Sequence, residues 1–211
     1  MTDLPSYISL GFPTLRPVQE KALDAGLLQG KSLLVCSPTG SGKTQVAEFS
    51  ILQYFHEKKA KSIYVVPLKA LASEKYQSFL KKYSSSGMRI GMSVGDTDSD
   101  DSYLGHYDLL ITTSEKLDSL IRHRAVWLDL VRLLVVDEVH LLHDAGRGPT
   151  LEMVITMLKH LVPPLQVLAL SATIGNPDEL AKWLGAVLVQ DSFRPCPLKQ
   201  GILFDGELTF Y

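Results

Sequence analysis

The sequence of 211 residues has few cysteines and no excess of basic charge. Its two cysteines, Cys36 and Cys196, are too few for a disulfide framework or a four-cysteine zinc site, and this usage fits a reducing compartment. Lysine and arginine total 21 against 23 acidic residues, which excludes a uniformly basic surface. Any contact with nucleic acid must therefore come from a local patch or from backbone groups.

Long apolar runs and an N-terminal targeting segment are also missing. No run approaches the roughly 18 apolar residues of a membrane-spanning helix, and residues 1–5 lack the basic and apolar regions of a signal peptide. We therefore expect no membrane association. The hydrophobic share of 45% and the charged share of 21% are those of a globular protein, and the length suits about one domain.

Short apolar runs alternate with longer segments of helical periodicity. Most of the runs show no polar alternation, which is typical of strands buried on both faces of a parallel sheet. The alternation predicts right-handed βαβ units and hence an α/β three-layer fold with a mostly parallel central sheet. The expected strands are 32–36, 62–66, 89–94, 107–111, 133–136, 167–170 and a short final one at 202–204; the expected helices are 17–28, 43–56, 68–82, 114–123, 150–161 and 177–184.

A glycine-rich segment follows the first expected strand and opens a helix, which is the context of a phosphate-binding loop. Its glycines let backbone N–H groups turn towards a polyphosphate, and the helix start adds a positive dipole end. We expect Lys43 to reach the β- and γ-phosphates and Thr44 to bind Mg²⁺. The strict pattern would have glycine at position 37, and a plain glycine-rich turn is the alternative. The expected nucleotide contacts are Ser37, Pro38, Thr39, Gly40, Ser41, Gly42, Lys43 and Thr44.

Two adjacent acids, Asp137 and Glu138, end another apolar strand. Carboxylates there are costly unless a cation is present, and a magnesium–nucleotide complex supplies one. We expect Asp137 to hold the metal and Glu138 to deprotonate the attacking water. The alternative is a strand that ends in solvated acids. His140 either packs inside the protein or bonds to a neighbouring polar loop when nucleotide binds.

The ordered motifs resemble those of superfamily 2 helicases. Within that superfamily the chain is most similar to the Ski2-like group, and especially to its archaeal DNA helicases of replication-fork repair. The finer match is carried by residues 170–177 and 194–198. The segments concerned are 15–19 (Leu-Arg-Pro-Val-Gln, the Q motif), 66–72 (motif Ia), 112–116 (motif Ib), 137–140 (Asp-Glu-Val-His, motif II) and 171–173 (Ser-Ala-Thr, motif III).

The resemblance implies a RecA-like P-loop NTPase domain that uses ATP with Mg²⁺, and it assigns further roles. Gln19 would select ATP at the adenine edge, while Phe12 would pack either on the base or in the core. Arg147 would make a strand contact or belong to a plain helix-entry loop. Residues 122–124, Arg-His-Arg, suit the end of a helix better than a nucleic-acid contact. The residues expected to face single-stranded DNA are Lys69, Thr112, Thr113 and Arg147, and those expected to couple nucleotide and strand are His140, Ser171 and Thr173.

The resemblance also predicts the domain organisation. Residues 1–30 would form the Q-motif region, 31–190 would carry motifs I to III, and 191–211 would lead to a second RecA-like domain that is absent from the sequence. We expect the first motor domain of an ATP-dependent 3′–5′ DNA helicase in fork repair or recombination. It would be cytoplasmic, nucleoid-associated in a prokaryote, and monomeric. An RNA helicase of the same group, and a nucleotide-dependent binding module without catalysis, are the alternatives.

Overall fold

The computed structural model describes residues 5–9, 11–12, 14–95, 101–196 and 199–210. Its centre is a parallel sheet of seven strands in the order β3-β4-β2-β5-β6-β1-β7. The expected class, an α/β fold with a parallel central sheet, is confirmed. The strands are β1 (Leu33–Cys36), β2 (Lys61–Val66), β3 (Ile90–Ser93), β4 (Leu109–Thr113), β5 (Val131–Val136), β6 (Gln166–Ser171) and β7 (Val187–Gln190).

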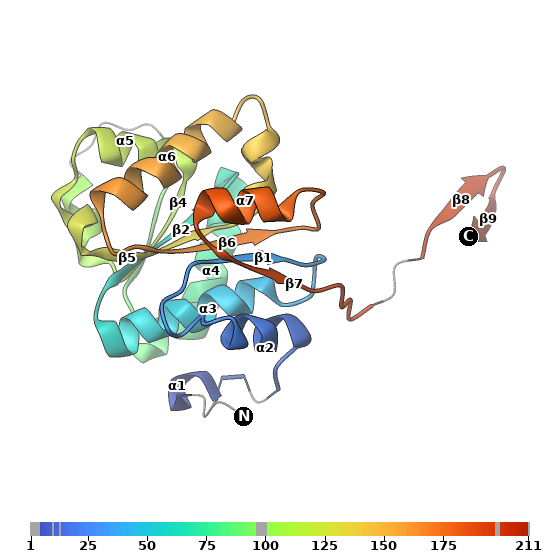
Figure 1. Cartoon of the computed structure of the whole chain (residues 1–211), viewed down its shortest axis with the longest axis horizontal. Helices are drawn as coiled ribbons and strands as arrows, with labels where there is room; N and C mark the ends of the chain where they lie inside the picture. The colour runs from blue at the N-terminus through green and yellow to red at the C-terminus, as the bar shows by residue number, and fades with distance from the viewer. Residues whose placement is uncertain (1–4, 10, 13, 96–100, 197–198, 211) are drawn as a thin grey trace.

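Helices cover both faces of this sheet and so complete three layers (Figure 1). One face carries α2 (Pro17–Asp24), α3 (Lys43–Gln53) and α4 (Lys69–Tyr83), with the short α1 (Ser6–Ser9) beyond them. The other face carries α5 (Ser114–Arg122), α6 (Gly148–Leu161) and α7 (Pro177–Leu184). Every residue of β1, β2, β4 and β6 is buried, as continuous apolar runs predict for strands covered on both faces.

Shorter elements fill the connections. A π-helical turn, η1 (Tyr54–Lys58), extends α3, and four 3₁₀ turns follow along the chain: η2 (Ser84–Ser86), η3 (Asp101–His106), η4 (Val126–Leu130) and η5 (Val139–His143). The antiparallel strands β8 (Gly201–Phe204) and β9 (Glu207–Phe210) form a hairpin that lies apart from the sheet in Figure 1. No helix among the described residues combines the length and apolar character needed to cross a membrane.

Several expected boundaries were wrong. The helix expected at 17–28 ends at Asp24, because Gly26 takes a left-handed conformation (φ 102°) and the chain closes a turn there. The strand expected at 107–111 lies at Leu109–Thr113, because the Tyr107 ring packs over the bare backbone of Gly91 before the strand begins. Strands β7 and β9 were not expected. Residues 96–100, in a stretch of the sequence rich in aspartate, lie outside the described part of the chain.

The strand order decides which of the expected site segments lie close together. In a parallel sheet all carboxyl ends lie at one edge, so the segments that follow β1, β2, β5 and β6 share that edge. Strand β6 lies between β1 and β5, with Cys36 paired to Ser171 and Val136 to Ala169. The phosphate-loop strand and the acidic strand are therefore next-but-one neighbours in the sheet.

Candidate nucleotide-binding and hydrolysis site

The glycine-rich loop joins β1 to α3 in the way the sequence predicts. Gly40 and Gly42 have φ angles of 81° and 111°, which side chains rarely adopt. A Cβ added at Gly42 would also lie 2.6 Å from the Gln19 side-chain nitrogen. The buried hydroxyls of Ser37 and Ser41 lie 2.7 Å apart and form a hydrogen bond across the inside of the loop. The loop is a backbone cradle at a helix start, which suits a phosphate chain.

The Lys43 amine lies inside this cradle. It donates to the carbonyl oxygens of Ser37 and Pro38, the latter at 3.0 Å. Burial lowers the pKa of Lys43, while the nearby charges of Glu138 and Asp137 act to raise it. The two acids and the lysine thus belong to one electrostatic cluster, as the sequence predicts. A hollow of about 350 Å³ separates them, lined by Arg16, Thr39, Gly40, Gly42, Lys43, Thr44, Gln45, Lys75, Asp137 and Glu138.

Asp137 is held by three donors at the end of β5. Its Oδ2 accepts from the Tyr64 hydroxyl at 2.8 Å and lies 3.1 Å from the Lys75 amine, while its Oδ1 accepts from the Glu138 backbone N–H at 3.1 Å. Lys75 also donates to Thr44 Oγ1 at 2.9 Å. The two expected magnesium ligands, Thr44 and Asp137, therefore share one cation. A hydroxyl and a carboxylate oxygen are hard ligands of the kind that Mg²⁺ takes from a protein, with waters and substrate phosphates completing its octahedral shell.

Glu138 follows in a left-handed backbone conformation (φ 51°, ψ 45°). This conformation is unfavourable for a residue with a side chain and recurs at active sites. Asp137 is nearly enclosed, whereas 39% of the Glu138 side chain is exposed. His140 Nδ1 lies 3.4 Å from Glu138 Oε2. Glu138 is thus the acid of the pair that solvent reaches.

Gln19 lies against the phosphate loop but uses its amide inside the protein. Its Oε1 accepts from the Arg16 backbone N–H at 2.9 Å in a capping box, and its Nε2 donates to the Gln45 side chain. Arg16 in turn donates to the Gly40 carbonyl. Phe12 packs edge-on against Phe49 with 4.9 Å between ring centroids, which is a core contact. The expected adenine contact of Gln19 remains a prediction.

The family model of the DEAD/DEAH box helicases matches residues 16–180. The chain belongs to the DEAD/DEAH box helicase family. It is 49% identical over 208 residues to the ATP-dependent DNA helicase Hel308 of Methanocella arvoryzae, covering 97% of this chain and 28% of that protein. It is 48% identical to Hel308 of Methanocaldococcus jannaschii, covering 95% of this chain and 17% of that protein. The resemblance to the archaeal Ski2-like helicases is confirmed.

A solved structure supports the fold of this helicase domain. The DUF1998 helicase MrfA bound to DNA superposes with a TM-score of 0.75 at 23% identity, covering 91% of this chain and 30% of that one. Hel308 of Pyrococcus abyssi is 46% identical, and the chain covers 27% of its length. The chain spans less than a third of each of these helicases.

The residues expected to contact DNA differ in how far they are exposed to solvent. Lys69 is exposed at the start of α4, and its amine lies near Gly95, two residues after the end of β3. Thr112 is fully buried and donates to the Ser93 carbonyl at 2.7 Å. Thr113 is buried and caps α5. Of these three, only Lys69 presents its side chain to solvent.

Arg147 and the coupling residues lie closer to the acids and the phosphate loop. Arg147 pairs with Asp144 at 3.3 Å and lines a small cavity beside Asp137 and Glu138. Ser171 is buried, its carbonyl accepts from the Ser37 backbone N–H at 3.2 Å, and its hydroxyl has no hydrogen-bond partner within the described residues. Thr173 is exposed and lines a separate hollow with Asp191. A backbone hydrogen bond therefore connects motif III to the phosphate loop.

Sequence reasoning missed Lys75 and Tyr64. Tyr64 lies in an apolar run, and burial together with the Asp137 charge raises its pKa far above the ordinary value. A signal for Lys75 existed, because it falls three residues after the buried Ala72 and four before the buried Phe79. A cation on the buried stripe of a helix indicates an acidic partner in the core.

Proposed function

We propose that this chain is the first RecA-like motor domain of an ATP-dependent DNA helicase and that it binds ATP with Mg²⁺. The observation that carries the proposal is the convergence of Lys43, Thr44, Asp137 and Glu138 around one hollow at the carboxyl edge of the sheet. The names of the Hel308 relatives and the matched family support the ATP and DNA assignments.

The residues divide the chemistry among them. The loop N–H groups and Lys43 bind the phosphates, and Thr44 and Asp137 hold the metal, which when bound neutralises charge on the phosphate oxygens. Tyr64 and the Glu138 N–H orient the Asp137 carboxylate. Glu138 accepts the proton of the attacking water, because it is the exposed acid beside the hollow. Gln19 reads the adenine once its amide leaves Gln45.

We also propose a track for single-stranded or forked DNA across the exposed start of α4. Lys69 contacts the strand there, and Arg147 contributes once it leaves Asp144. Thr112 and Thr113 support this surface from the sheet and the α5 cap. His140, Ser171 and Thr173 transmit the nucleotide state to it. Translocation is 3′–5′, and the parent protein acts in fork repair or recombination at the nucleoid, in the cytoplasm.

Turnover requires a second RecA-like domain of the same protein, which supplies arginine fingers; such a finger contributes about 10³–10⁵ in rate. We propose that the motor works as a monomer. The chain alone is then expected to bind an ATP analogue and to hydrolyse ATP negligibly. DNA-stimulated hydrolysis by the chain alone, at the rate of a complete motor, would contradict the need for a second domain.

Two substitutions test the site. Lys43→Ala should abolish binding of a fluorescent ATP analogue by this chain, while Lys81→Ala, on the exposed end of α4, serves as the control. Glu138→Gln in the full-length protein should keep nucleotide binding and lose at least a hundredfold in hydrolysis.

Unwinding of matched DNA and RNA duplexes by the full-length protein separates the DNA helicase from the RNA helicase. A full-length protein that binds ATP without turnover would be a binding module.

A further inference from the structure

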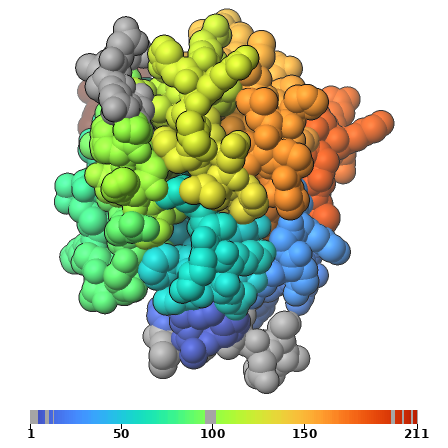
Figure 2. All heavy atoms as spheres, turned by 90° about the vertical axis from the view of Figure 1, so that its left-hand side faces the viewer, coloured from blue at the N-terminus to red at the C-terminus, as the bar shows by residue number. Residues whose placement is uncertain are grey.

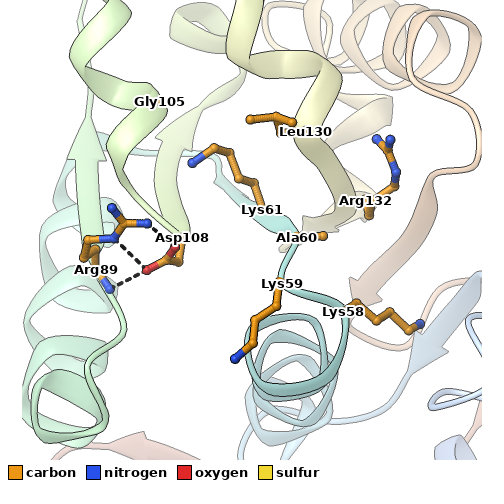
Figure 3. Close-up of a pocket in the computed structure, with 9 residues that line it drawn as sticks. All are labelled: Lys58, Lys59, Ala60, Lys61, Arg89, Gly105, Asp108, Leu130 and Arg132. Carbon is orange, nitrogen blue, oxygen red and sulfur yellow. Dashed lines mark hydrogen bonds and ion pairs between the residues drawn. The ribbon is translucent and has the colours of Figure 1, made fainter.

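A second, larger hollow lies at the opposite edge of the sheet. It measures about 630 Å³, and most of the side chains that line it are basic (Figure 3). We call it the basic pocket. It takes its charge from Lys58, Lys59, Lys61, Arg89 and Arg132, against the single acid Asp108. The roles assigned above to the nucleotide and the DNA track use none of these residues.

The topology brings these cations together from segments far apart in the sequence. Lys61 begins β2, Arg89 and Asp108 directly precede β3 and β4, and Arg132 lies near the start of β5. These four strands are neighbours in the sheet, so their amino ends share one edge. In Figure 2 the cyan, green and yellow segments of this region adjoin on one face. The length of β2 separates this edge from the nucleotide site by roughly 17 Å, at about 3.3 Å per residue.

The positive charge of the basic pocket is poorly compensated. Asp108 is already engaged by Arg89, with hydrogen bonds of 2.8 and 3.1 Å from the guanidinium. Lys61 is only 9% exposed and its amine donates to the Tyr107 carbonyl. Burial lowers the pKa of Lys61; Asp108 opposes this effect and Arg89 adds to it. Five cations and one acid leave a charge of +4, so the rest of the chain, with a total of −2, carries −6.

Lys58 and Lys59 complete the rim from the end of η1. Their amines lie over the rings of Tyr54 and Phe55, at 4.2 and 5.7 Å from the centroids. The adjacent Glu57 is bound by the Tyr7 hydroxyl and by Gln53. Among the described residues that line the pocket, none is aromatic and only Leu130 is a large apolar side chain. The pocket therefore offers charge without a base-stacking platform or an apolar anchor.

We propose that the basic pocket binds the phosphate groups of a nucleic-acid strand, as a second contact remote from the nucleotide site. This inference rests on the proposed function, because a helicase domain meets such strands. Binding would be independent of base sequence and weakened by salt, since cations replace the counterions of the phosphates. An acidic peptide would find the same charge but little apolar surface to fix it.

Lysine footprinting tests the site directly. The chain is acetylated at low salt in four samples: alone, with single-stranded oligothymidylate, with an abasic strand, and with polyglutamate. Mass spectrometry then gives the rate of acetylation of each lysine. Both strands should slow modification of Lys58 and Lys59 at least threefold, and leave the exposed Lys81 and Lys182 unchanged. Protection of Lys69 alone would overturn the basic pocket and leave the proposed DNA track standing.

Other patterns are equally decisive. Protection of Lys58 and Lys59 without Lys69 supports the basic pocket and contradicts the proposed track, and no protection of any of the three contradicts both. Equal protection by polyglutamate overturns a nucleic-acid occupant in favour of an acidic peptide. For single-stranded DNA, each phosphate contact contributes about 0.7 to the slope of log affinity against log salt concentration. The variant Lys58→Gln/Lys59→Gln loses two such contacts, so its slope should be smaller by about 1.4. The control Lys81→Gln/Lys182→Gln carries the same charge change and should leave the slope unaltered.

Discussion

Lys75 supplies the cation between Thr44 and Asp137 in this structure, at 2.9 and 3.1 Å from their oxygens. A carboxylate that is nearly enclosed by protein is costly without a cation beside it, and the Lys75 ammonium is that cation for Asp137. The ammonium therefore competes with magnesium for the same ligands. With Thr44 and Asp137 as the proposed Mg²⁺ ligands, metal binding would displace the Lys75 amine from its present position between them.

Lys75→Met tests this competition at the residue scale. Without nucleotide and metal, we expect the free energy of unfolding to fall by about 1–3 kcal/mol, because Asp137 loses its charged donor. Added Mg²⁺ alone should then bind more tightly to the variant than to the wild type, by calorimetry. Lys81→Met on the same helix is the control. An unchanged Mg²⁺ affinity would show that Lys75 does not occupy the metal position.

Glu138 combines a strained backbone conformation with a place beside the candidate nucleotide site. Its backbone is left-handed (φ 51°), and the residue lines the same hollow as Lys43. Glycine accepts this conformation without the steric cost of a Cβ. We expect Glu138→Gly to be more stable than Glu138→Ala by about 1 kcal/mol in urea unfolding. Both variants lack the carboxylate, so the comparison isolates the backbone effect. Equal stability of the two would mean that the left-handed conformation is relaxed in solution.

At the scale of elements, the amino ends of β3 and β4 are pinned by Arg89 and Asp108. Burial acts to raise the pKa of Asp108, but hydrogen bonds from the Arg89 side chain and backbone outweigh it and hold that pKa below its usual value. A carboxyl group whose pKa is lower in the folded protein than in the unfolded chain stabilises the fold. This stabilisation is fully present at pH values above the unfolded pKa of about 3.9. That contribution is lost as the pH falls through the folded value.

The comparison of Asp108→Asn with the wild type measures this pinning. We expect the wild type to be the more stable protein at pH 7, and the difference to shrink progressively once the pH falls below about 4. Thermal unfolding across that range gives the curve. Asp118→Asn is the matched control, because Asp118 has a similarly covered carboxylate whose ion pair with Arg122 lies within the single helix α5. A stability difference that does not change with pH would rule out the ion pair as its origin.

At the scale of the whole molecule, the hairpin β8–β9 stands apart from the seven-stranded body (Figure 1). Its side chains Ile202, Phe204 and Phe210 are 62%, 80% and 59% exposed. The core clusters contain no residue of this hairpin among those described. The hairpin therefore contributes little to the cooperative unit formed by the sheet and its helices.

Ending the chain after Cys196 should leave the thermal midpoint within about 2 °C of that of the full sequence, because none of the described residues removed belongs to the core clusters. Differential scanning calorimetry measures both forms. Chain 1–186, which also removes β7 and the ion pair of Lys21 with Asp191, should unfold at a clearly lower temperature. A large loss in the first case would show that the hairpin packs on the body in solution.

The sequence by itself determined the α/β class, the parallel sheet and the glycine-rich loop between β1 and α3, because these depend on local periodicity and on glycines at fixed positions. It also predicted the acid pair of Asp137 and Glu138, since a strand end with two carboxylates needs a cation. Edge strand β7 escaped prediction because it is short and half exposed, so it lacks a continuous apolar run.

Only the tertiary structure decided which distant groups meet. Lys75 and Tyr64 reach Asp137, and the cations of the basic pocket assemble, because the strand order places their segments at common edges of the sheet. It also decided that Thr112 is enclosed while Lys69 is exposed. The physical reason is that contacts across a sheet depend on strand order and register, which local sequence patterns do not encode.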